Sequence, residues 1–597
     1  MVADPGFCKV KPYDLLFTHF LWEVMMEASF WDGKRAPGIQ DTLDLSQYSA
    51  AVEVIEMAFK KYAHRPAFTS IGHTLTYADI DERSAAFANY LQNHTNLKPG
   101  DTIAIQMPNI LQYPIAMYGA LRAGLKVTNT NPLYTEREML HQFNDSGAKA
   151  LVCMSVFARS VQNVLPDTGI ETVIVTDLAD MLPGVKRVLI NFAAKHIKKM
   201  VPAYSLPGAV SFPKALKLGK GKGFAANYMS NPDDTIILQY TGGTTGVAKG
   251  AELTNRNLIA NMLQSKLMML QLDDKGQPLK PAHSVNVVAP LPLYHIYAFT
   301  VHLMSLFEQG DHSILIANPR DTETFIKFIK PWKLTTFVGL NTLFVSLMAS
   351  PRFKELDFSK LTYTISGGTA LMDDTAKRWK DITGVGISEG YGLTECSPAV
   401  TINPGAGLER MGTVGQAIPG TALKCIDDLG EEVPQGERGE LCVKGPQVMK
   451  GYWKRPDASK NAFTADGEWF RTGDVAVIDQ DGFVKIVDRI KDMIIVSGFN
   501  VFPNEIEGVV AKHPAVENCA VIGVPDVKTG EAVKLYVVTK NASLSAEDIK
   551  AHCKENLTAY KMPRHIEFRD ELPMTPVGKI LRRELKDEEE AKASAAA

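Results

Sequence analysis

The chain has 597 residues, which is too long for a single hydrophobic core, so two or more domains are expected. Hydrophobic residues make up 45% of it and charged residues 22%, as in an ordinary globular protein. The formal net charge is −3 and Lys and Arg are spread along the chain, so there is no electrostatic case for nucleic acid as a partner.

Cysteine usage and hydropathy narrow the class further. The seven cysteines are scattered and form no CxxC pair, so neither a disulfide framework nor a zinc site is suggested, and a reducing cytoplasm fits. The chain contains no run of about 18 apolar residues, so no membrane-spanning helix is predicted. The apolar stretch 13–31 is broken by Asp14, His19 and Glu23 and lacks a cleavable ending, which argues against a signal peptide.

Strands and helices alternate from residue 46 to residue 240. Apolar strands are predicted at 103–106, 126–129, 150–153, 171–175 and 235–240, with a helix at 111–123. Strands of this kind, separated by helices, indicate a sheet that is buried on both faces.

The segment 185–200 has the pattern of an amphipathic helix. Its apolar residues Val185, Leu189, Phe192, Ile197 and Met200 fall on one face. Polar residues Arg187, Asn191, Lys195 and Lys198 fall on the other. A surface helix packed on its own domain is the commoner arrangement, and a weak, reversible contact with anionic lipid is the alternative.

The strand at 235–240 runs into Tyr-Thr-Gly-Gly-Thr-Thr-Gly-Val-Ala-Lys-Gly at 240–250, and Thr254 then suits the N-cap of a helix at 255–270. Three glycines allow the backbone to turn its N–H groups toward one point, while three threonine hydroxyls and one ammonium group add donors. These residues are Gly242, Gly243, Gly246, Thr241, Thr244, Thr245 and Lys249. That chemistry suits the binding of a polyphosphate, and the alternative is a surface turn rich in Gly and Thr with no ligand. It is not the Walker pattern, because Val247 replaces a required Gly and Gly250 follows Lys249.

Polar residues follow several later strands. His295 lies at a strand end within 289–298, and the stretches 339–342 and 366–370 follow apolar strands at 335–338 and 361–365. Ligands in such sheets bind at the carboxyl ends of strands, so nucleotide and substrate are expected to meet there.

The sequence Glu-Gly-Tyr-Gly-Leu-Thr-Glu at 389–395 is a second motif. Its two glycines let the backbone approach a flat ring, and Tyr391 offers a stacking face. Glu395 offers a hard oxygen ligand of the kind that Mg²⁺ takes in ATP chemistry. Alone, Glu395 would be an ordinary surface carboxylate.

From Val414 the pattern changes to short strands and turns, which indicates a small β-subdomain ending at Asp474. A carboxylate there suits a ribose diol, since it can accept from both hydroxyls. Residues 493–585 then have the order β-loop-α-β-β-α-β, the size of a small α+β domain. The charged and alanine-rich end, 588–597, is expected to be frayed.

Together these motifs resemble the adenylate-forming superfamily, which includes acyl-CoA synthetases, adenylation domains of peptide synthetases and luciferases. The resemblance covers roughly Phe30 to Arg583. Within the superfamily, the stretches 240–251, 292–298, 497–504 and 577–584 look like those of bacterial long-chain fatty acyl-CoA synthetases.

The resemblance implies an α/β fold class, with a large N-terminal domain of two α/β sheets plus a β-subdomain and a small, mobile α+β C-terminal domain. The expected parts are an unmatched extension at 1–25, an adenylation domain at 26–488, a lid domain at 489–585 and a disordered tail at 586–597. The unmatched extension lies upstream of an expected natural start at Met25 or Met26.

The resemblance also implies a role for individual residues. Those implied in catalysis are Lys579, Thr244, Glu395 and His295, of which Thr244 and Glu395 form the metal pair. Those implied in ATP or AMP binding are Tyr240, Thr241, Gly242, Gly243, Thr244, Thr245, Gly246, Lys249, Gly368, Thr369, Gly390, Tyr391, Gly392, Leu393, Thr394, Asp474 and Arg489. Acyl binding is implied for Tyr297, Phe299, Gly339, Asn341 and Gly367, with Phe299 as a gate. Lys491 is the implied hinge, and Ser497, Gly498, Phe499 and Asn500 are implied to line a CoA tunnel.

The activity implied is the ATP-dependent conversion of long-chain fatty acids to fatty acyl-CoA through an acyl-adenylate, with release of AMP and pyrophosphate, feeding β-oxidation. ATP, Mg²⁺ and coenzyme A are the expected cofactors and substrates. A homodimer and a reversible contact with inner-membrane lipid stay open. The alternatives are a medium-chain or aryl acyl-CoA ligase, a non-catalytic acyl-nucleotide sensor, and a kinase-type NTPase that would release ADP.

Overall fold

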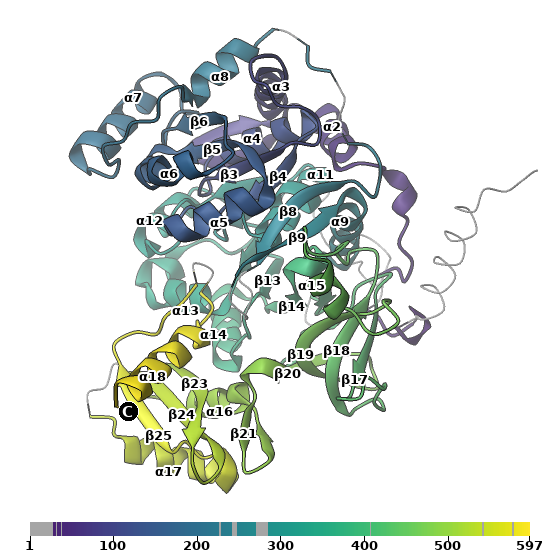
Figure 1. Cartoon of the computed structure of the whole chain (residues 1–597), viewed down its shortest axis with the longest axis vertical. Coiled ribbons are helices and arrows are strands. Elements are labelled where there is room, and N and C mark those ends of the chain that lie inside the picture. The colour runs from purple at the N-terminus through teal and green to yellow at the C-terminus, as the bar shows by residue number, and fades with distance from the viewer. Residues whose placement is uncertain are drawn as a thin grey trace, which may run out of the picture.

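A computed structural model describes residues 28–31, 33–36, 39–221, 223–225, 229–241, 247–269, 285–405, 408–539, 543–575 and 578–596. Figure 1 shows a large N-terminal part of several layers, with a small C-terminal domain at the opposite end of the long axis. Among the described residues, no helix has both the length and the apolar character that crossing a bilayer would require.

The first sheet has seven strands in the order β7-β6-β5-β3-β4-β8-β9. Their bounds are β3 Thr102–Gln106, β4 Lys126–Asn129, β5 Ala148–Met154, β6 Thr172–Thr176, β7 Val210–Ser211, β8 Thr235–Thr241 and β9 Lys249–Thr254. All neighbours are parallel except β8 and β9. The predicted strands coincide with β3, β4, β5, β6 and β8, whereas β9 was not predicted, because its sequence KGAELT lacks an apolar run.

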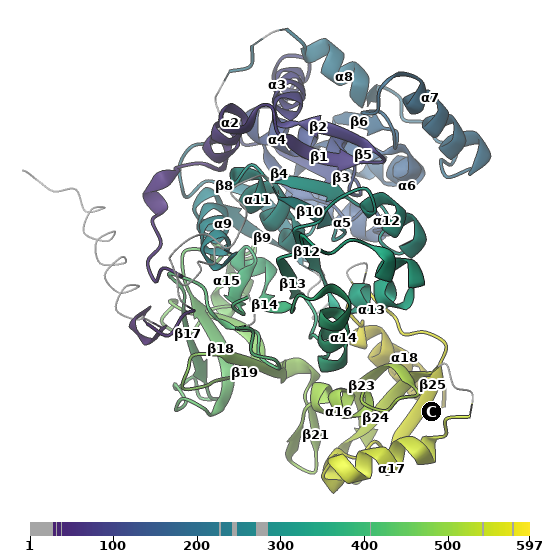
Figure 2. The same ribbon diagram turned by 180° about the vertical axis from the view of Figure 1, so that it is seen from behind.

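The second sheet has nine strands in the order β16-β15-β14-β13-β12-β10-β11-β1-β2. Their bounds are β1 Pro66–Ser70, β2 His73–Thr76, β10 Asn286–Ala289, β11 His312–Leu315, β12 Thr336–Gly339, β13 Tyr363–Gly367, β14 Ser388–Gly392, β15 Ala399–Ile402 and β16 Gln416–Ala417. The strands β1 and β2 are visible in the rear view of Figure 2. Because β1 pairs in parallel with β11, an early segment of the chain forms the edge of a sheet whose other strands come from the middle of the chain.

Helices cover and separate these sheets. In the N-terminal part they are α2 Ala51–Tyr62, α3 Tyr77–Asn93, α4 Gln112–Arg122, α5 Glu136–Ser146, α6 Ala158–Val164, α7 Gly184–Phe192, α8 Phe212–Gly219, α9 Asn255–Met269, α10 Ile296–Ala298, α11 Leu306–Glu308, α12 Thr322–Ile329, α13 Asn341–Ala349, α14 Asp373–Thr383 and α15 Pro456–Asn461. The helix α4 is buried along its whole length, and the Tyr118 hydroxyl donates to the Leu303 carbonyl at 2.9 Å. This helix therefore ties the first sheet to the second.

Two smaller sheets complete the chain. The β-subdomain has the order β17-β18-β19-β20, with β17 Ala422–Ile426, β18 Arg438–Lys444, β19 Phe470–Ile478 and β20 Val484–Arg489. The C-terminal domain contains β21 Ile494–Val496, β22 Phe499–Val501, α16 Pro503–Val510, β23 Val516–Asp526, β24 Gly530–Thr539, α17 Ala546–Asn556, β25 His565–Arg569 and α18 Arg582–Ala596. A short 3₁₀ turn, Ile490–Asp492, connects β20 to β21.

The expected disordered tail at 586–597 is wrong for nearly all of its length, because α18 continues to Ala596. Ion pairs hold this helix to the domain. Lys534 on β24 pairs with Glu589 at 2.7 Å, and Arg569 on β25 pairs with Glu588 at 2.6 Å. The charges of the tail, which suggest a solvated end when they are read alone, thus have partners in the fold.

The segment 185–200 forms α7 and a π-helix at Ala193–Ile197. The favoured interpretation, an apolar face packed on its own domain, is wrong: Val185 is 72% exposed, Leu189 61% and Phe192 55%. Asn191, expected on the solvated face, turns inward instead. Its amide oxygen accepts from the Ala179 backbone N–H at 2.8 Å, and its amide nitrogen donates to Asp180 at 3.1 Å.

The buried side chain of Asn109, just after β3, is a further link between the two sheets. Its amide donates to the carbonyls of Ala289 and Leu291 at 2.9 and 2.8 Å, and its oxygen accepts from the Leu293 N–H at 2.8 Å. The Asn109 side chain thus satisfies three backbone groups of the segment that leads to His295.

We expect Asn109→Ala to lower the free energy of unfolding by about 3 kcal/mol, since buried backbone groups would lose their partners. Chemical denaturation followed by circular dichroism measures this change. Asn556→Ala is the matched control, because its amide makes one exposed hydrogen bond to the His552 carbonyl within α17. Equal stability of the two variants would contradict the bridging role of Asn109.

Candidate active site

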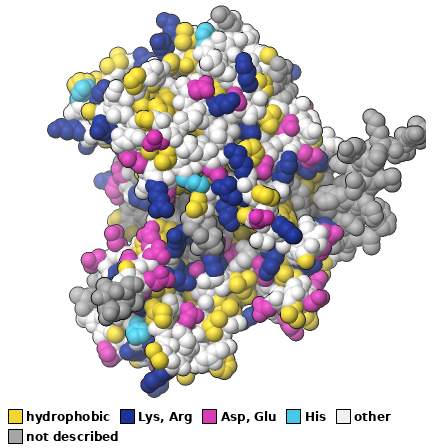
Figure 3. Space-filling view, viewed as in Figure 1, with side chains coloured by type: hydrophobic (Ala, Val, Ile, Leu, Met, Phe, Trp, Pro, Cys, Tyr) yellow, Lys and Arg dark blue, Asp and Glu magenta, His cyan; other side chains and the backbone are white. Residues whose placement is uncertain are grey.

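The carboxyl ends of β8, β12, β13 and β14 open into one cavity of about 3560 Å³ between the N-terminal part and the C-terminal domain. Lys and Arg side chains lie on both sides of the gap between the two parts (Figure 3). The cavity exceeds an ordinary small-ligand pocket, so it has room for several substrates.

Most of the described site candidates line this cavity. They are Tyr240, Thr241, Lys249, His295, Tyr297, Asn341, Gly367, Gly368, Thr369, Gly390, Tyr391, Gly392, Leu393, Thr394, Glu395, Asp474, Arg489, Lys491 and Lys579. They come from all three sheets of the N-terminal part, the linker after β20 and the C-terminal domain, so the fold gathers residues that are hundreds of positions apart.

The remaining candidates do not line the cavity or cannot be placed. Phe299 is 1% exposed and lies behind the wall to which its neighbours Thr300 and Val301 contribute. A Cβ on Gly339 would lie 2.8 Å from the Phe344 ring, so that glycine provides close packing. Gly242, Gly243, Thr244, Thr245 and Gly246 lie outside the described residues.

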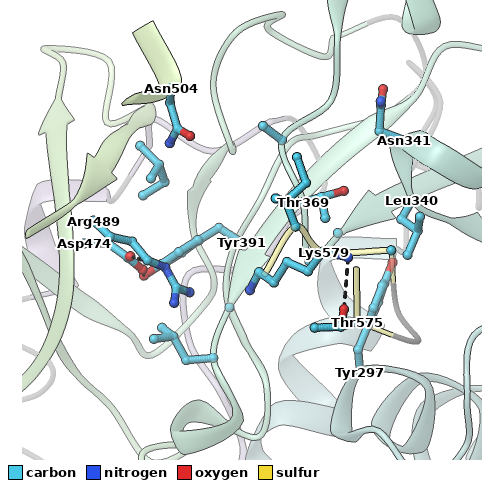
Figure 4. A pocket seen from close by; sticks show the side chains of 18 of the residues that line it. Tyr297, Leu340, Asn341, Thr369, Tyr391, Asp474, Arg489, Asn504, Thr575 and Lys579 are labelled. Atoms are coloured by element: carbon cyan, nitrogen blue, oxygen red, sulfur yellow. Dashed lines mark hydrogen bonds and ion pairs between the residues drawn. The ribbon is translucent and has the colours of Figure 1, made fainter. Parts of the chain in front are cut away.

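Asp474 on β19 organises one end of the site (Figure 4). The Tyr391 hydroxyl donates to its Oδ2 at 2.6 Å, and the Arg489 Nε lies 3.2 Å from its Oδ1. Asp474 is buried, whereas Arg489 keeps its guanidinium partly exposed. The triad places a ring, a carboxylate and a cation together, which suits a nucleoside monophosphate.

Glu395 and Lys249 meet at Tyr452. The Tyr452 hydroxyl donates to Glu395 Oε1 at 2.8 Å, and the Lys249 ammonium lies 5.2 Å from the centre of the Tyr452 ring. A ring that contacts a cation on its face and a carboxylate at its hydroxyl fixes both side chains at the cavity wall.

Lys579 reaches this wall from the C-terminal domain. Its loop is a tight turn in which the Thr575 N–H donates to the Lys579 carbonyl at 2.7 Å and the Lys579 N–H donates to Thr575 Oγ1 at 3.0 Å. Gly578 has φ +70°, and a Cβ there would lie 2.5 Å from Thr342 Oγ1. Only glycine permits this turn to dock so closely on the N-terminal part.

The surroundings of Lys579 change its acidity. Desolvation by the surrounding protein lowers the pKa of Lys579 to about 8, and the neighbouring cations Arg489 and Lys491 add to the shift. The side chain keeps some water contact through the open cavity, although desolvation is the larger cause of the lowered pKa and the neighbouring cations are the smaller one. Figure 4 shows Lys579 extending between Tyr297 and the Asp474–Arg489 pair.

His295 is held as a neutral ring. Burial lowers the pKa of His295 to about 4, and the charge of Lys579 contributes. Its Nδ1 accepts the Tyr297 backbone N–H at 3.3 Å, so the proton of the neutral ring is on Nε2. The ring can therefore donate a hydrogen bond at neutral pH without adding a charge.

The loop expected to line a CoA tunnel, Ser497 to Asn500, lies elsewhere in this conformation. It forms the turn of the β21–β22 hairpin, with Ser497 and Gly498 at positive φ. The ring of Phe499 is 56% exposed and stacks on Tyr560 at 4.9 Å. None of the four residues borders the cavity.

Two residues of the site were missed by the sequence reasoning. Tyr452 belongs to no recognisable motif and acts only through its contacts with Glu395 and Lys249. Glu389 begins the motif 389–395 but was given no role. It lines the cavity, accepts from the Leu371 N–H at 3.0 Å, and burial raises its pKa to about 7.

A nucleotide-sized site at strand ends, completed by a lysine from a second domain, defines an enzyme that brings a nucleotide and a second substrate together. The family models agree. That of the AMP-binding enzymes matches residues 55–453, and that of their C-terminal domain matches residues 505–579. The chain belongs to the AMP-binding enzyme family.

Individual relatives are similar over almost their full length. The long-chain-fatty-acid–CoA ligase of Yersinia pestis is 49% identical, over 93% of this chain and 97% of that protein. The ligase of the same name from Escherichia coli O6:H1 is 46% identical, over 94% and 98%. The crystal structure of ATP-bound MatB from Rhodopseudomonas palustris is 29% identical and matches with a TM-score of 0.77, over 90% of this chain and 98% of that one; the apo form gives 0.68.

The lowered pKa of Lys579 generates a prediction about pH. Below pH 8 the side chain is an ammonium, and above it an amine that cannot offset phosphate charge. We therefore expect kcat/KM for ATP in pyrophosphate release to fall as the pH rises above about 8, because this ratio reports the free enzyme. Lys579→Arg, less active because of its different shape, should lose this alkaline limb, since a guanidinium stays charged.

Lys491→Arg is the matched control, because burial also lowers the pKa of Lys491 to about 8. If the limb belongs to Lys579, it persists in Lys491→Arg. If the alkaline limb disappears in Lys491→Arg and persists in Lys579→Arg, the limb belongs to Lys491, and the prediction is refuted.

Proposed function

We propose that this protein activates long-chain fatty acids with ATP and transfers the acyl group to coenzyme A, supplying acyl-CoA for β-oxidation. The observation that carries the proposal is the insertion of Lys579 from the C-terminal domain into a cavity already lined by Tyr391, Asp474 and Glu395. The relatives named long-chain-fatty-acid–CoA ligases support the choice of substrate.

In the first half-reaction a carboxylate oxygen of the fatty acid attacks the α-phosphorus of ATP. The bond from that phosphorus to the bridging oxygen of pyrophosphate breaks, which leaves an acyl-adenylate. No general base is required, because the acid is already ionised at neutral pH. The barrier comes mainly from crowding of negative charge, so positioned cations are the main catalytic requirement.

The residues of the cavity supply this field. We assign Lys579 to the carboxylate and the α-phosphate, Lys249 with the loop 242–246 to the outer phosphates, and neutral His295 to the carboxylate as a hydrogen-bond donor. Asp474 would accept from the ribose hydroxyls, with Arg489 beside it. The close approach of backbone at Gly390 and Gly392 suits an adenine ring stacked on Tyr391.

The donor set fits Mg²⁺ as well. Glu395 presents a carboxylate to the cavity, oriented by the Tyr452 hydroxyl. Carboxylate oxygen is the ligand that Mg²⁺ prefers, and its remaining ligands would be phosphate oxygens, water and the hydroxyl that we assign to Thr244. When bound, Mg²⁺ would neutralise part of the charge of the leaving pyrophosphate.

The acyl chain requires an apolar extension of the cavity. Met269, Leu291, Ile296 and Val301 are among the apolar residues that line the cavity, and we assign them to the acyl chain. A Cβ at Gly367 would lie 3.2 Å from the Tyr297 ring, so this glycine lets the ring approach the β13 end. We assign Tyr297, Asn341 and Gly367 to the carboxyl end of the acid, Gly339 to packing the adjoining wall, and Phe299, behind the cavity wall, to a gate that would have to move.

In the second half-reaction the thiolate of coenzyme A attacks the acyl carbonyl carbon, and the bond from that carbon to the AMP oxygen breaks. We infer that the C-terminal domain turns about Lys491 between the two steps, which removes Lys579 and brings Ser497–Asn500 to the cavity. The exposed hairpin of that loop and the closer match to ATP-bound MatB than to apo MatB support this order.

The proposal places the reaction in the cytoplasm, with reversible contact at the inner membrane, where fatty acids partition.

An oxygen-transfer experiment tests the proposed function. Fatty acid labelled with ¹⁸O in its carboxylate is incubated with the enzyme, ATP and coenzyme A, and the AMP is analysed by mass spectrometry. Label in AMP is expected, since the acid oxygen that attacks phosphorus leaves with AMP. Unlabelled AMP, or ADP as the product, would exclude acyl-adenylate formation. A panel of palmitate, octanoate and coumarate separates the long-chain ligase from the medium-chain and aryl alternatives.

Lys579→Ala should separate the two half-reactions. We expect adenylate formation to fall by about 100- to 1,000-fold, the usual loss when one charge-stabilising group is removed. Thioester formation from supplied acyl-AMP should be largely spared. Rapid-quench measurement of each half-reaction decides. Lys592→Ala, at the far end of α18, serves as a control that keeps both rates, and an equal loss of both in Lys579→Ala would contradict the domain movement.

A further inference from the structure

The segment around α7 has a composition unlike the rest of the chain. Between Asp180 and Asp233 there is no Asp or Glu, although the whole chain has 67 of them. The same segment contains nine basic residues: Lys186, Arg187, Lys195, Lys198, Lys199, Lys214, Lys217, Lys220 and Lys222. A chain of net charge −3 therefore carries a strongly cationic region on its first sheet.

The same region exposes large apolar side chains. We define the α7 surface as Val185, Val188, Leu189, Phe192, Ile197 and Met200, together with the basic residues Lys186, Arg187, Lys195, Lys198 and Lys199. The six apolar residues are between 46% and 72% exposed. Soluble proteins seldom gather so many apolar side chains on one exposed element without a partner for it.

The exposure follows from how the helix is anchored. Asn191 bonds to Ala179 and Asp180, and Ala194 is buried, so the face that carries them points inward. Val185, Val188, Leu189 and Phe192 follow the spacing i, i+3, i+4 and i+7 and share the opposite face. The outward direction of this apolar stripe is fixed by buried hydrogen bonds.

The charges on the α7 surface have no acidic partners in the part of the chain that the structure describes. Within the described ranges, none of its five basic residues forms an ion pair. An unpaired cationic rim around an apolar stripe matches the requirements of an interfacial helix, which buries its apolar face at the headgroup level while Lys and Arg contact anionic lipid.

We propose that the α7 surface docks this protein reversibly on an anionic lipid bilayer. Charge complementarity selects the lipid, and the apolar stripe gives the depth of insertion. Figures 1 and 3 show that this surface lies at the upper left, at the end of the long axis opposite the C-terminal domain, where hydrophobic and basic side chains gather. The benefit, access to fatty acid dissolved in the membrane, rests on the proposed function, whereas the docking itself does not.

Co-sedimentation with vesicles tests the proposal. The full-length protein is mixed with phosphatidylcholine vesicles that contain about 30% phosphatidylglycerol, or with phosphatidylcholine alone. We expect binding to the anionic vesicles that weakens as salt increases, and little binding to the neutral ones. Leu189→Glu/Phe192→Glu and Lys195→Glu/Lys198→Glu should each weaken the binding at least tenfold.

Matched controls place the same changes elsewhere on the exposed surface. Leu429→Glu adds a charge at a side chain that is 87% exposed, and Lys354→Glu/Lys360→Glu reverses two exposed lysines on another element. Both should bind vesicles like the wild type, and thermal melting verifies the folding of every variant. Vesicle-free AMP formation from soluble fatty acid should be unchanged in all four variants, since none alters the cavity.

Three results of the vesicle experiment would overturn the proposal: wild-type protein that does not sediment with anionic vesicles, equal binding to neutral vesicles, or full binding by both α7 variants. Binding of the α7 surface to an acidic protein in place of lipid would also overturn it. Because AMP formation is measured without vesicles, a failure of docking leaves the ligase proposal standing, and a failure of AMP formation is seen separately.

Discussion

The electrostatic crowding around Lys579 is the constraint on which the arrangement of the two domains depends. The C-terminal domain brings this ammonium beside Arg489 and Lys491, and the nearby carboxylates of Asp474 and Glu395 compensate only part of the charge. The lowered pKa of Lys579 means that this lysine holds its proton less tightly in the docked position than a lysine in water does. At neutral pH this penalty is fully present, and it is relieved only as the pH rises toward the ordinary pKa of a lysine.

Anionic substrates reverse that balance. A triphosphate and a carboxylate in the cavity would convert three mutually repelling cations into a matched binding site. Besides the Lys579 turn, two contacts between described residues help to hold the docked position. The Asn504 backbone N–H donates to Asp488 at 2.8 Å, and Arg438 lies over the ring of Phe502 at 5.4 Å. The turn about Lys491 that we propose would break both contacts, and the charge of bound substrates would favour the docked position.

The sequence predicted those parts of the fold whose local pattern and tertiary role agree. Strand β4 was predicted to the residue, and its β-branched residues Val127 and Thr128 are fully buried in the parallel sheet. Helix α9 begins where Thr254 was expected to cap it, and the Thr254 hydroxyl accepts from the Asn257 N–H at 3.2 Å. The motif residues from 390 to 395 all reach the cavity for the same reason, since glycines and strand ends determine their geometry locally.

What the sequence could not supply depends on partners that are distant in the chain. Tyr452 gains its place in the site only because β9 brings Lys249 beside it and Glu395 accepts a hydrogen bond from its hydroxyl. The helix α18 is ordered by Lys534 and Arg569, and neither pairing has a local signature. The helical pattern of 185–200 was evident, but which face turned inward was decided by Asn191 and its bonds to 179–180.

The position of the α7 surface is compatible with the domain movement that we propose between the two half-reactions. It lies on the first sheet, at the end of the long axis opposite the C-terminal domain (Figures 1 and 2). The α4 helix and Asn109 tie that sheet to the second one, so the whole N-terminal part can stay attached to a bilayer as one unit. Among the described residues, the C-terminal domain follows the linker at 490–492 and contacts the N-terminal part at Asp488, at Arg438 and at the docked Lys579 turn. The proposed movement of this domain would therefore leave the proposed membrane contact in place.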